Sequence, residues 1–205
     1  MRNLALMWVL AGVAVALLAA GDGKPSVSTF TDKRDGKVYK IVKIGSQKWF
    51  AENLNYAAEG SVCYDNKNNN CARYGRLYNW ETALTACPVG THLPTDKEWD
   101  TLVDYAGGKE KAGKKLKSKT GWNENGNGTN DYGWSALPGG NGFSSGYFLD
   151  VGNAGYWWDT TEDNADEALG RGMDYDTENV FRYNGSKRDL FSVRCVQDKR
   201  KESQK

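Results

Sequence analysis

The stretch that decides the fold is W-E-T-A-L-T-A-C-P-V-G-T-H-L-P-T-D-K-E-W-D-T-L, residues 80–102. Apolar residues in its first half recur at i, i+3, i+4 and i+7, which is the spacing of one helical face. They are Trp80, Ala83, Leu84 and Cys87. Pro88 and Gly90 follow directly and end this helix, because neither residue supports its continuation. The first half therefore predicts a short helix that carries a cysteine on its apolar face.

The second half of the stretch predicts another helix. Thr95 followed by Glu98 forms a capping box, in which both side chains satisfy backbone donors at a helix start. The apolar stripe then continues through Trp99, Leu102, Val103 and Ala106. Gly107-Gly108 ends it. We expect helices over about 79–87 and 95–107, joined at a tight corner.

The remaining secondary structure is predicted to be mostly short strands. V-Y-K-I-V-K-I-G-S-Q-K-W-F reads as a hairpin turning at Gly45-Ser46. Four further strands are expected at 155–161, 167–175, 180–183 and 191–196, with Asn184-Gly185 separating the last two. In the final strand, period two places Phe191, Val193 and Cys195 on one face. The lysine-rich segment 109–119 is expected to add a helical turn.

Six segments resemble a known family: G-S-Q-K-W-F-A-E-N-L-N-Y (45–56), Y-G-R-L-Y-N-W-E-T-A (74–83), C-P-V-G-T-H-L-P-T-D-K-E-W (87–99), D-Y-G-W-S-A-L-P-G-G (131–140), G-Y-W-W-D-T-T-E (155–162) and S-V-R-C-V-Q-D (192–198). Together they resemble the Fibrobacter succinogenes major paralogous domain, a bacterial extracytoplasmic family of poorly defined function. The arrangement of helix and final strand also resembles the C-type-lectin-like fold. The resemblance covers about positions 30–198 and indicates a fold and a compartment far more than an activity.

The resemblance implies an α+β, C-type-lectin-like domain. In it, two short helices pack on short antiparallel strands, beside a long ordered loop. The chain has four cysteines, and four cysteines allow three pairings. In this fold a cysteine on the first helix pairs with one in the final strand. The resemblance therefore selects Cys87–Cys195 and leaves Cys63–Cys71 as a local staple.

The ends of the chain predict export. Residues 1–21 read as a signal peptide, with Arg2 before an apolar run from Leu4 to Leu18 and small residues at the cleavage site. A retained membrane anchor is the alternative, but the run is short for a span of about 20 residues. We expect a linker over 22–29, one domain over 30–198 and a basic tail over 199–205. The mature chain should have no membrane span and be secreted, periplasmic or on the cell surface.

Charge and composition exclude some functions. The formal net charge is +1, and loss of Arg2 with the signal peptide leaves zero. A near-neutral chain does not favour nucleic acid. The basic runs 109–119 and 199–205 read as solvated surface.

Few residues suggest catalysis or metal binding. His92 is the only histidine and sits at the corner between the two helices, where we expect a structural or surface role. Formylglycine-generating enzymes resemble residues 90–99 (G-x-x-L-P-T-x-x-E-W), but they use reactive cysteines and none is left over here. We expect no cofactor, although the carboxylates between Asp150 and Asp176 could supply oxygens to a structural calcium ion. The tripeptides of sugar-binding C-type lectins are absent, so calcium-dependent sugar binding does not carry over.

Aromatic residues are the remaining candidates for binding. Trp49, Trp80 and Trp99 follow apolar patterns and are assigned to the core. The Gly/Asn-rich segment 120–146 contains too many aromatics for a linker and reads as a long ordered loop. Next to it, Tyr156, Trp157 and Trp158 are consecutive in a strand, so Trp157 faces away from the other two. The predicted ligand-binding residues are Trp122, Asn123, Tyr132, Trp134 and Trp158.

These observations predict a non-catalytic, exported binding or adhesion module, with a polysaccharide as the candidate ligand. Flat aromatic faces beside Asn and Asp suit sugar rings, since the rings stack and the polar groups bond hydroxyls. Possible partners are therefore a glycan or a cell-surface protein. The alternatives are a structural or protein-interaction surface protein and, third, an enzyme of unrecognised type.

Overall fold

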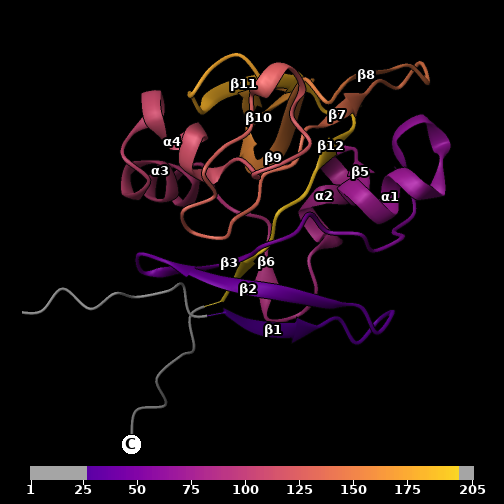
Figure 1. The fold of residues 1–205 in the computed structure, drawn as a ribbon. Coiled ribbons are helices and arrows are strands. Elements are labelled where there is room, and N and C mark those ends of the chain that lie inside the picture. Colours follow the sequence, from indigo (N-terminus) through magenta and orange to yellow (C-terminus); the bar gives the residue numbers. More distant parts are fainter. Residues whose placement is uncertain (1–26, 199–205) are drawn as a thin grey trace, which may run out of the picture.

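A computed structural model describes residues 27–198 and shows an α+β domain (Figure 1). The described residues contain four α-helices: α1 (Asn68–Tyr74), α2 (Trp80–Ala86), α3 (Asp96–Tyr105) and α4 (Lys109–Leu116). Two short 3-10 turns, η1 (Tyr64–Asn66) and η2 (Asn123–Asn125), accompany them. The predicted signal peptide (1–21) and basic tail (199–205) lie outside the described residues.

The strands form two sheets. The five-stranded sheet, the lower layer in Figure 1, has the order β1-β2-β3-β13-β6. Its strands are β1 (Val27–Thr31), β2 (Val38–Ile44), β3 (Gln47–Phe50), β13 (Val196–Gln197) and β6 (Thr91–His92). The larger sheet has the order β11-β10-β9-β12-β5-β4, with β7 paired to β9 and β8 paired to β7. Its strands are β4 (Ser61–Val62), β5 (Leu77–Tyr78), β7 (Gly139–Gly142), β8 (Phe148–Val151), β9 (Ala154–Glu162), β10 (Glu167–Asp174), β11 (Phe181–Ser186) and β12 (Phe191–Ser192).

The last segment of the domain joins the two sheets. β12 pairs with β5 and β9 in the larger sheet, and β13 pairs with β3 and β6 in the smaller one. Between them, the buried Arg194 donates hydrogen bonds to Asn53 Oδ1 (2.7 Å) and to the carbonyl of Phe50 (3.2 Å). Its guanidinium also lies 3.9 Å over the ring of Trp134. This crossing therefore ties both sheets to the loop that carries Trp134.

Both predicted disulfides are present. Cys87, at the end of α2, is bonded to Cys195 in the crossing segment, and Cys63 is bonded to Cys71 in α1. Phe191, Val193 and Cys195 lie in the same core cluster, as period two predicted. The long bridge thus closes the domain between α2 and its last strands.

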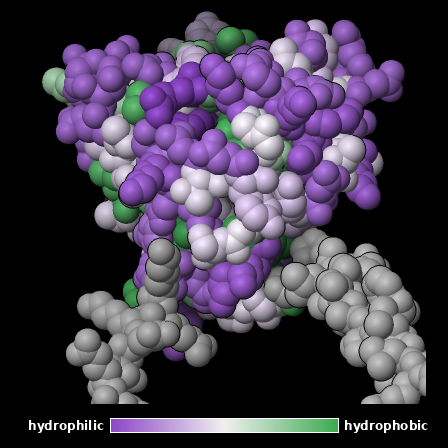
Figure 2. Space-filling model, turned by 90° about the vertical axis from the view of Figure 1, so that its left-hand side faces the viewer, coloured by the Kyte–Doolittle hydropathy of each residue, from purple (hydrophilic) through white to green (hydrophobic). Residues whose placement is uncertain are grey.

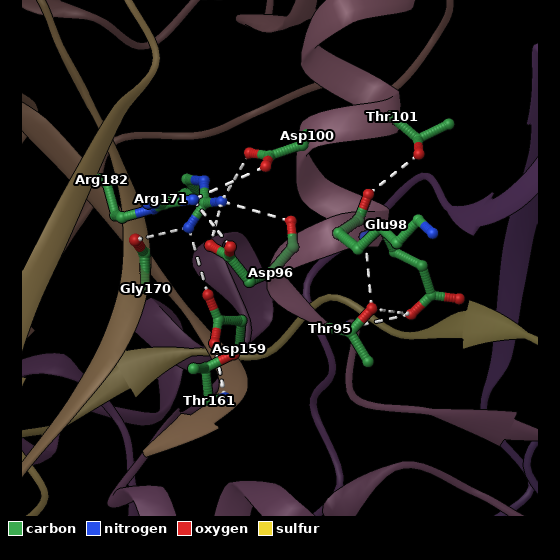
Figure 3. A network of polar contacts seen from close by, with 11 residues as sticks. Thr95, Asp96, Glu98, Asp100, Thr101, Asp159, Thr161, Gly170, Arg171 and Arg182 are labelled. Atoms are coloured by element: carbon green, nitrogen blue, oxygen red, sulfur yellow. Dashed lines mark hydrogen bonds and ion pairs between the residues drawn. The ribbon is translucent and has the colours of Figure 1, made fainter. Parts of the chain in front are cut away.

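The two predicted helices are confirmed as α2 and α3. Asn79 caps α2 by accepting a hydrogen bond from the backbone N–H of Thr82 (2.9 Å). At α3, Glu98 N–H donates to Thr95 Oγ1 (3.2 Å), and Thr95 N–H donates to Glu98 Oε2 (2.9 Å). The capping box read from the sequence therefore starts the helix, as Figure 3 shows.

Several boundaries differ from the prediction. β1 begins at Val27, inside the predicted linker 22–29, because Val27–Thr31 pairs with β2 along its whole length. The helix α1 was not predicted, and the lysine-rich segment forms the two-turn helix α4.

The predicted turn at Asn184-Gly185 is wrong. Both residues lie within β11, and the chain reverses later, over 187–190. Gly185 serves packing instead of a turn, since an added Cβ would lie 2.9 Å from the ring of Phe191.

The core consists of two clusters. Trp157 on β9 and Trp49 on β3 lie in the first, and the next residues along each strand, Trp158 and Phe50, lie in the second. The opposite facing of Trp157 and Trp158 is therefore confirmed. The first cluster holds a group of packed indoles: Trp49, Trp99, Trp134 and Trp157.

The face that Figure 2 shows is largely hydrophilic, with hydrophobic residues scattered over it. Among the lysines of 109–119, Lys109, Lys111 and Lys119 are exposed, as predicted for a solvated run. Lys117 is buried instead and donates to the carbonyls of Asp174 and Thr177. No helix in 27–198 is long and apolar enough to cross a membrane.

Candidate functional site

The strand β10 presents two different faces through the sequence Gly170-Arg171-Gly172. On one face, the buried Arg171 points towards α3 (Figure 3). It donates hydrogen bonds to Asp96 Oδ1 (2.6 Å), Asp100 Oδ1 (2.9 Å) and Asp159 Oδ2 (3.1 Å).

These ion pairs hold α3 against the larger sheet. Arg182 on β11 adds a second cation, 2.7 Å from Asp96 Oδ2. Burial raises the pKa of Asp159, which is only partly offset by hydrogen bonds to Thr161 and the charge of Arg171. The carboxylates of Asp96, Asp100 and Asp159 are thus all engaged with arginines.

Ion pairs also engage two of the carboxylates that the sequence offered for a structural calcium ion. Asp159 is bonded to Arg171, and Glu162 is paired with Lys187. Within 27–198, no group of three or more His, Cys, Asp or Glu side chains is placed to hold a metal ion.

The opposite face of β10 carries a group of half-buried rings, which we name the platform: Tyr156, Phe181 and Tyr183. Gly172 pairs with Tyr156 on β9 and with Phe181 on β11. A Cβ added at Gly172 would lie 2.3 Å from the ring of Phe181. The glycine therefore makes room for rings from both neighbouring strands, and the centroids of Tyr156 and Tyr183 lie 5.1 Å apart.

Buried aromatic side chains support the platform from below. Phe191 stacks on Tyr156 at 5.4 Å and on Trp158 at 4.2 Å between centroids. The indole of Trp158 is fixed in turn by a 2.8 Å hydrogen bond from Nε1 to the carbonyl of Tyr78. Contacting aromatic side chains thus extend from the buried Trp158 through Phe191 to the half-buried Tyr156.

Three carboxylates lie around the platform, and we name them the rim: Asp150, Asp174 and Asp189. Asp174 follows Gly172 by two residues on β10 and so shares its face. Burial raises the pKa of Tyr156, and the nearby charges of Asp174 and Asp150 raise it further. Burial likewise raises the pKa of Tyr183, with a contribution from Asp189. The three rim residues are half-buried, and burial raises the pKa values of Asp174 and Asp189.

A groove of about 610 Å³ adjoins the platform across the turn 187–190. Its walls come from the β7–β8 hairpin, the segment before α1, the start of α2, the turn between β9 and β10, and this turn. They include Val62, Asn66, Asn79, Phe143, Phe148 and Arg188. The turn is shared, because Asp189 belongs to the rim while Arg188 and Leu190 line the groove.

The Cys63–Cys71 bridge holds one wall of this groove. Arg76 donates to the carbonyl of Ser61 (2.7 Å) and lies within hydrogen-bonding distance of both sulfurs. The ring of Tyr64, next to Cys63, packs on Phe148 of the hairpin with centroids 5.2 Å apart. The bridge therefore fixes a segment that has little core of its own.

The sequence model of the Fibrobacter succinogenes major domain matches residues 42–197, which is most of the chain. The chain belongs to this family. No curated protein and no solved structure matches it. The matched region of the Fibrobacter major domain includes the platform, the rim, the groove and both disulfides, whereas β1 precedes it.

Within this Fibrobacter major domain, three of the five predicted ligand-binding residues are buried. Trp122 is 4% exposed, and Trp134 and Trp158 are 0% exposed. Trp122 Nε1 donates to the carbonyl of Ala136 (3.0 Å), and Trp134 packs among the other indoles of the first cluster. Their assignment as stacking surfaces is therefore wrong. The domain has few aliphatic runs, so its loop indoles fill the core.

The other two predicted residues lie at separate places. Asn123 is exposed, and its Nδ2 donates to Asn153 Oδ1 (2.9 Å) in the turn between β8 and β9. This turn follows β8, the strand that carries Asp150 of the rim. Tyr132 is half-buried against Tyr105 of α3, with ring centroids 5.5 Å apart. The structure does not bring Tyr132 to the same surface.

His92 is engaged by two carboxylates. Its Nδ1 lies 2.6 Å from Asp198 and its Nε2 3.0 Å from Glu98. The hydrogen bond with Glu98, helped by Asp198 and opposed by burial, raises the pKa of His92 to about 9. This shift favours the imidazolium at neutral pH, in which both ring nitrogens donate to carboxylates.

The platform was missed because its residues do not cluster in the sequence. Tyr156 was noticed beside Trp158, and Phe181 and Tyr183 alternate in a strand that was predicted only in part. The signal that could have found them is the alternation of Gly170 and Gly172 in β10, which marks a strand crossed by large neighbouring side chains.

Proposed function

We propose that this chain is an exported, non-catalytic binding module that holds a polysaccharide on the platform. The observation that carries the proposal is the group of half-buried rings of Tyr156, Phe181 and Tyr183, bordered by carboxylates. A pyranose ring presents an apolar C–H face that stacks on aromatic rings, and its hydroxyls donate to carboxylates. Within residues 27–198, neither the hydroxyl of Tyr156 nor that of Tyr183 is engaged in a hydrogen bond.

The groove supports binding of a polymer in preference to a single sugar. It shares the turn 187–190 with the rim and combines the rings of Phe143 and Phe148 with the amides of Asn66 and Asn79. Single stacking contacts are modest, so affinity for one sugar should be on the order of millimolar, or about 4 kcal/mol. Several such contacts along one polysaccharide chain raise the overall affinity.

The proposal of export rests on two observations. Residues 1–21 have the pattern of a signal peptide, and all four cysteines are bonded. Disulfides persist in oxidising compartments, which include the periplasm, the cell surface and the medium.

We also propose that the α+β architecture is a C-type-lectin-like fold. The bridge from the end of α2 to the last strand segment supports this, because it joins the elements that such domains join. Support for a non-catalytic role comes from the groups that chemistry would use: His92 is held between carboxylates, and no thiol is free.

Retention of the mature chain on insoluble polysaccharides tests the proposed function. We expect wild type to bind at least one of cellulose, chitin, chitosan and xylan. Tyr183→Ala should lose most of this retention, since its ring is half-exposed. Tyr105→Ala is the matched control, because this exposed tyrosine lies on α3 away from the platform. If wild type binds none of these polymers, or if both variants bind alike, the platform is not a glycan site.

A protein partner is the second candidate. Tyr147 is 72% exposed and Leu149 is 52% exposed, and both lie on the projecting β7–β8 hairpin (Figure 1). Exposed apolar side chains at such a tip suit a protein surface. Under the glycan proposal, a Tyr147→Ser/Leu149→Ser variant keeps its retention on polysaccharides.

A further inference from the structure

We propose that the rim makes the platform select glycans that carry free amino groups and reject acidic glycans. This inference rests on the proposed function and adds the charge class of the ligand. Its specificity-determining residues are Asp150, Asp174 and Asp189.

The strand register places the rim beside the rings. Asp174 pairs with Ala154 on β9, one step along the same face from the pair of Gly172 with Tyr156. Asp150 lies on β8, which pairs with β7, and Gly140 of β7 pairs with Gly155, the neighbour of Tyr156. Asp189 lies in the turn between β11, which carries Tyr183, and β12, which carries Phe191. Burial raises the pKa of Tyr183, and the charge of Asp189 raises it further. Three separate elements thus bring one carboxylate each to the same surface.

Nearby cations neutralise this surface only in part. Lys117 is buried, and its Nζ donates to the carbonyls of Asp174 and Thr177. Its charge offsets part of the effect of burial on the pKa of Asp174. Arg171 and Arg182 face α3 on the other side of the sheet, where they pair with Asp96 and Asp100. Arg188, in the turn itself, is exposed and lines the groove. The rim therefore leaves a net negative charge around the rings.

Rings and carboxylates together suit an ammonium group. A cation is attracted to the face of an aromatic ring, and a carboxylate accepts a charge-assisted hydrogen bond from it. A glucosamine unit offers both an apolar face for stacking and an ammonium for the rim. A glucuronate unit offers the same apolar face but carries a carboxylate. The rim carboxylates repel this charge, and binding beside them would also remove part of its hydration. The same rings can therefore distinguish sugars that differ in one substituent.

The experiment compares three soluble oligomers of equal length and the same β-1,4 linkage: glucosamine, glucose and glucuronic acid. Their affinities for the mature chain are measured by calorimetry at low and at high salt. We expect the order glucosamine, glucose, glucuronic acid, with differences that shrink at high salt.

Asp174→Asn and Asp150→Asn identify the residues responsible. Asn is nearly isosteric with Asp, and it tolerates the positive φ of 65° at position 150. Each substitution should weaken glucosamine binding about fivefold, the factor for one unit charge about 4 Å away in water, and leave glucose binding unchanged. Asp131→Asn, an exposed acid beside Tyr132, is the matched control and should change neither. Urea unfolding of each variant confirms that it is folded.

The outcomes separate the inference from the proposed function. Equal affinities for the three oligomers, or tighter binding of glucuronic acid, overturn the inference and leave the platform as a glycan site. Unchanged glucosamine binding in both variants overturns the role of the rim. If no oligomer binds but a lysine peptide does, the ammonium is recognised on a protein, and the glycan assignment is wrong. If neither binds, both proposals fail.

Discussion

The guanidinium of Arg171 on β10 donates a 3.1 Å hydrogen bond to the carboxylate of Asp159 on β9, and both side chains are buried. The two glycines beside Arg171 face the other way, towards the platform. The pair therefore fixes the two strands from behind, while their opposite face remains clear for aromatic rings.

Removing the cation of this pair should destabilise the domain strongly. Arg171→Met leaves Asp159 buried without its partner, so we expect a loss of about 3–5 kcal/mol in the free energy of unfolding. Asp159→Asn on its own should cost less, because the amide is neutral and burial already disfavours the charged carboxylate. In the double variant the two losses should not add. Urea unfolding of the three variants measures this, and strictly additive losses would show that the pair is not coupled.

Local signals in the sequence predicted the elements that depend on neighbouring residues. The α3 capping box, the hairpin turn at Gly45 and the opposite facing of Trp157 and Trp158 are of this kind. The helix α1 carried no such signal, because N-N-N-C-A-R-Y has no apolar stripe and is held by its disulfide.

The platform could not be predicted in the same way. It depends on which strands become neighbours, and Tyr156 and Phe181 meet only because both pair with Gly172. The burial of Trp122 and Trp134 likewise depends on the tertiary fold. A Gly/Asn-rich loop shows no period, so its sequence does not reveal which side chains turn inwards.

The burial of Trp122 changes the expected effect of its removal. Trp122→Ala should cost about 3–5 kcal/mol, as much as Trp99→Ala, because both indoles lie in the first core cluster. From the sequence, Trp122 would be expected to cost far less. Tyr147→Ala, at the exposed hairpin tip, is the control and should change stability by less than about 0.5 kcal/mol. A small loss for Trp122→Ala would place its indole outside the core.

A methyl group at Gly172 should disturb the platform more than the rest of the fold. In Gly172→Ala the new Cβ meets the ring of Phe181 at 2.3 Å, so this ring must move. We expect a loss of about 1–3 kcal/mol in stability, as for other overpacked sites, together with weaker polysaccharide retention. Combining it with Phe181→Ala should restore stability but not retention. If Gly172→Ala retains both, the rings do not depend on this glycine.

The ion pairs of His92 should make stability depend on pH. The hydrogen bond with Glu98 raises the pKa of His92 from 6.5 to about 9, so its contribution is complete below pH 6.5 and is lost as the pH rises towards 9. Burial opposes ionisation of Glu98, but His92 and the backbone of Thr95 lower its pKa from 4.5 to about 2. Its contribution is present above pH 4.5 and is lost as the pH falls towards 2. Both contributions are complete only between these limits, and because the His92 side chain is 38% exposed we expect about 1 kcal/mol. Urea unfolding of wild type and His92→Gln at pH 5.5 and pH 9 tests this. The gap between the two proteins should nearly close at pH 9, and a gap that is the same at both pH values would show that the imidazolium contributes nothing.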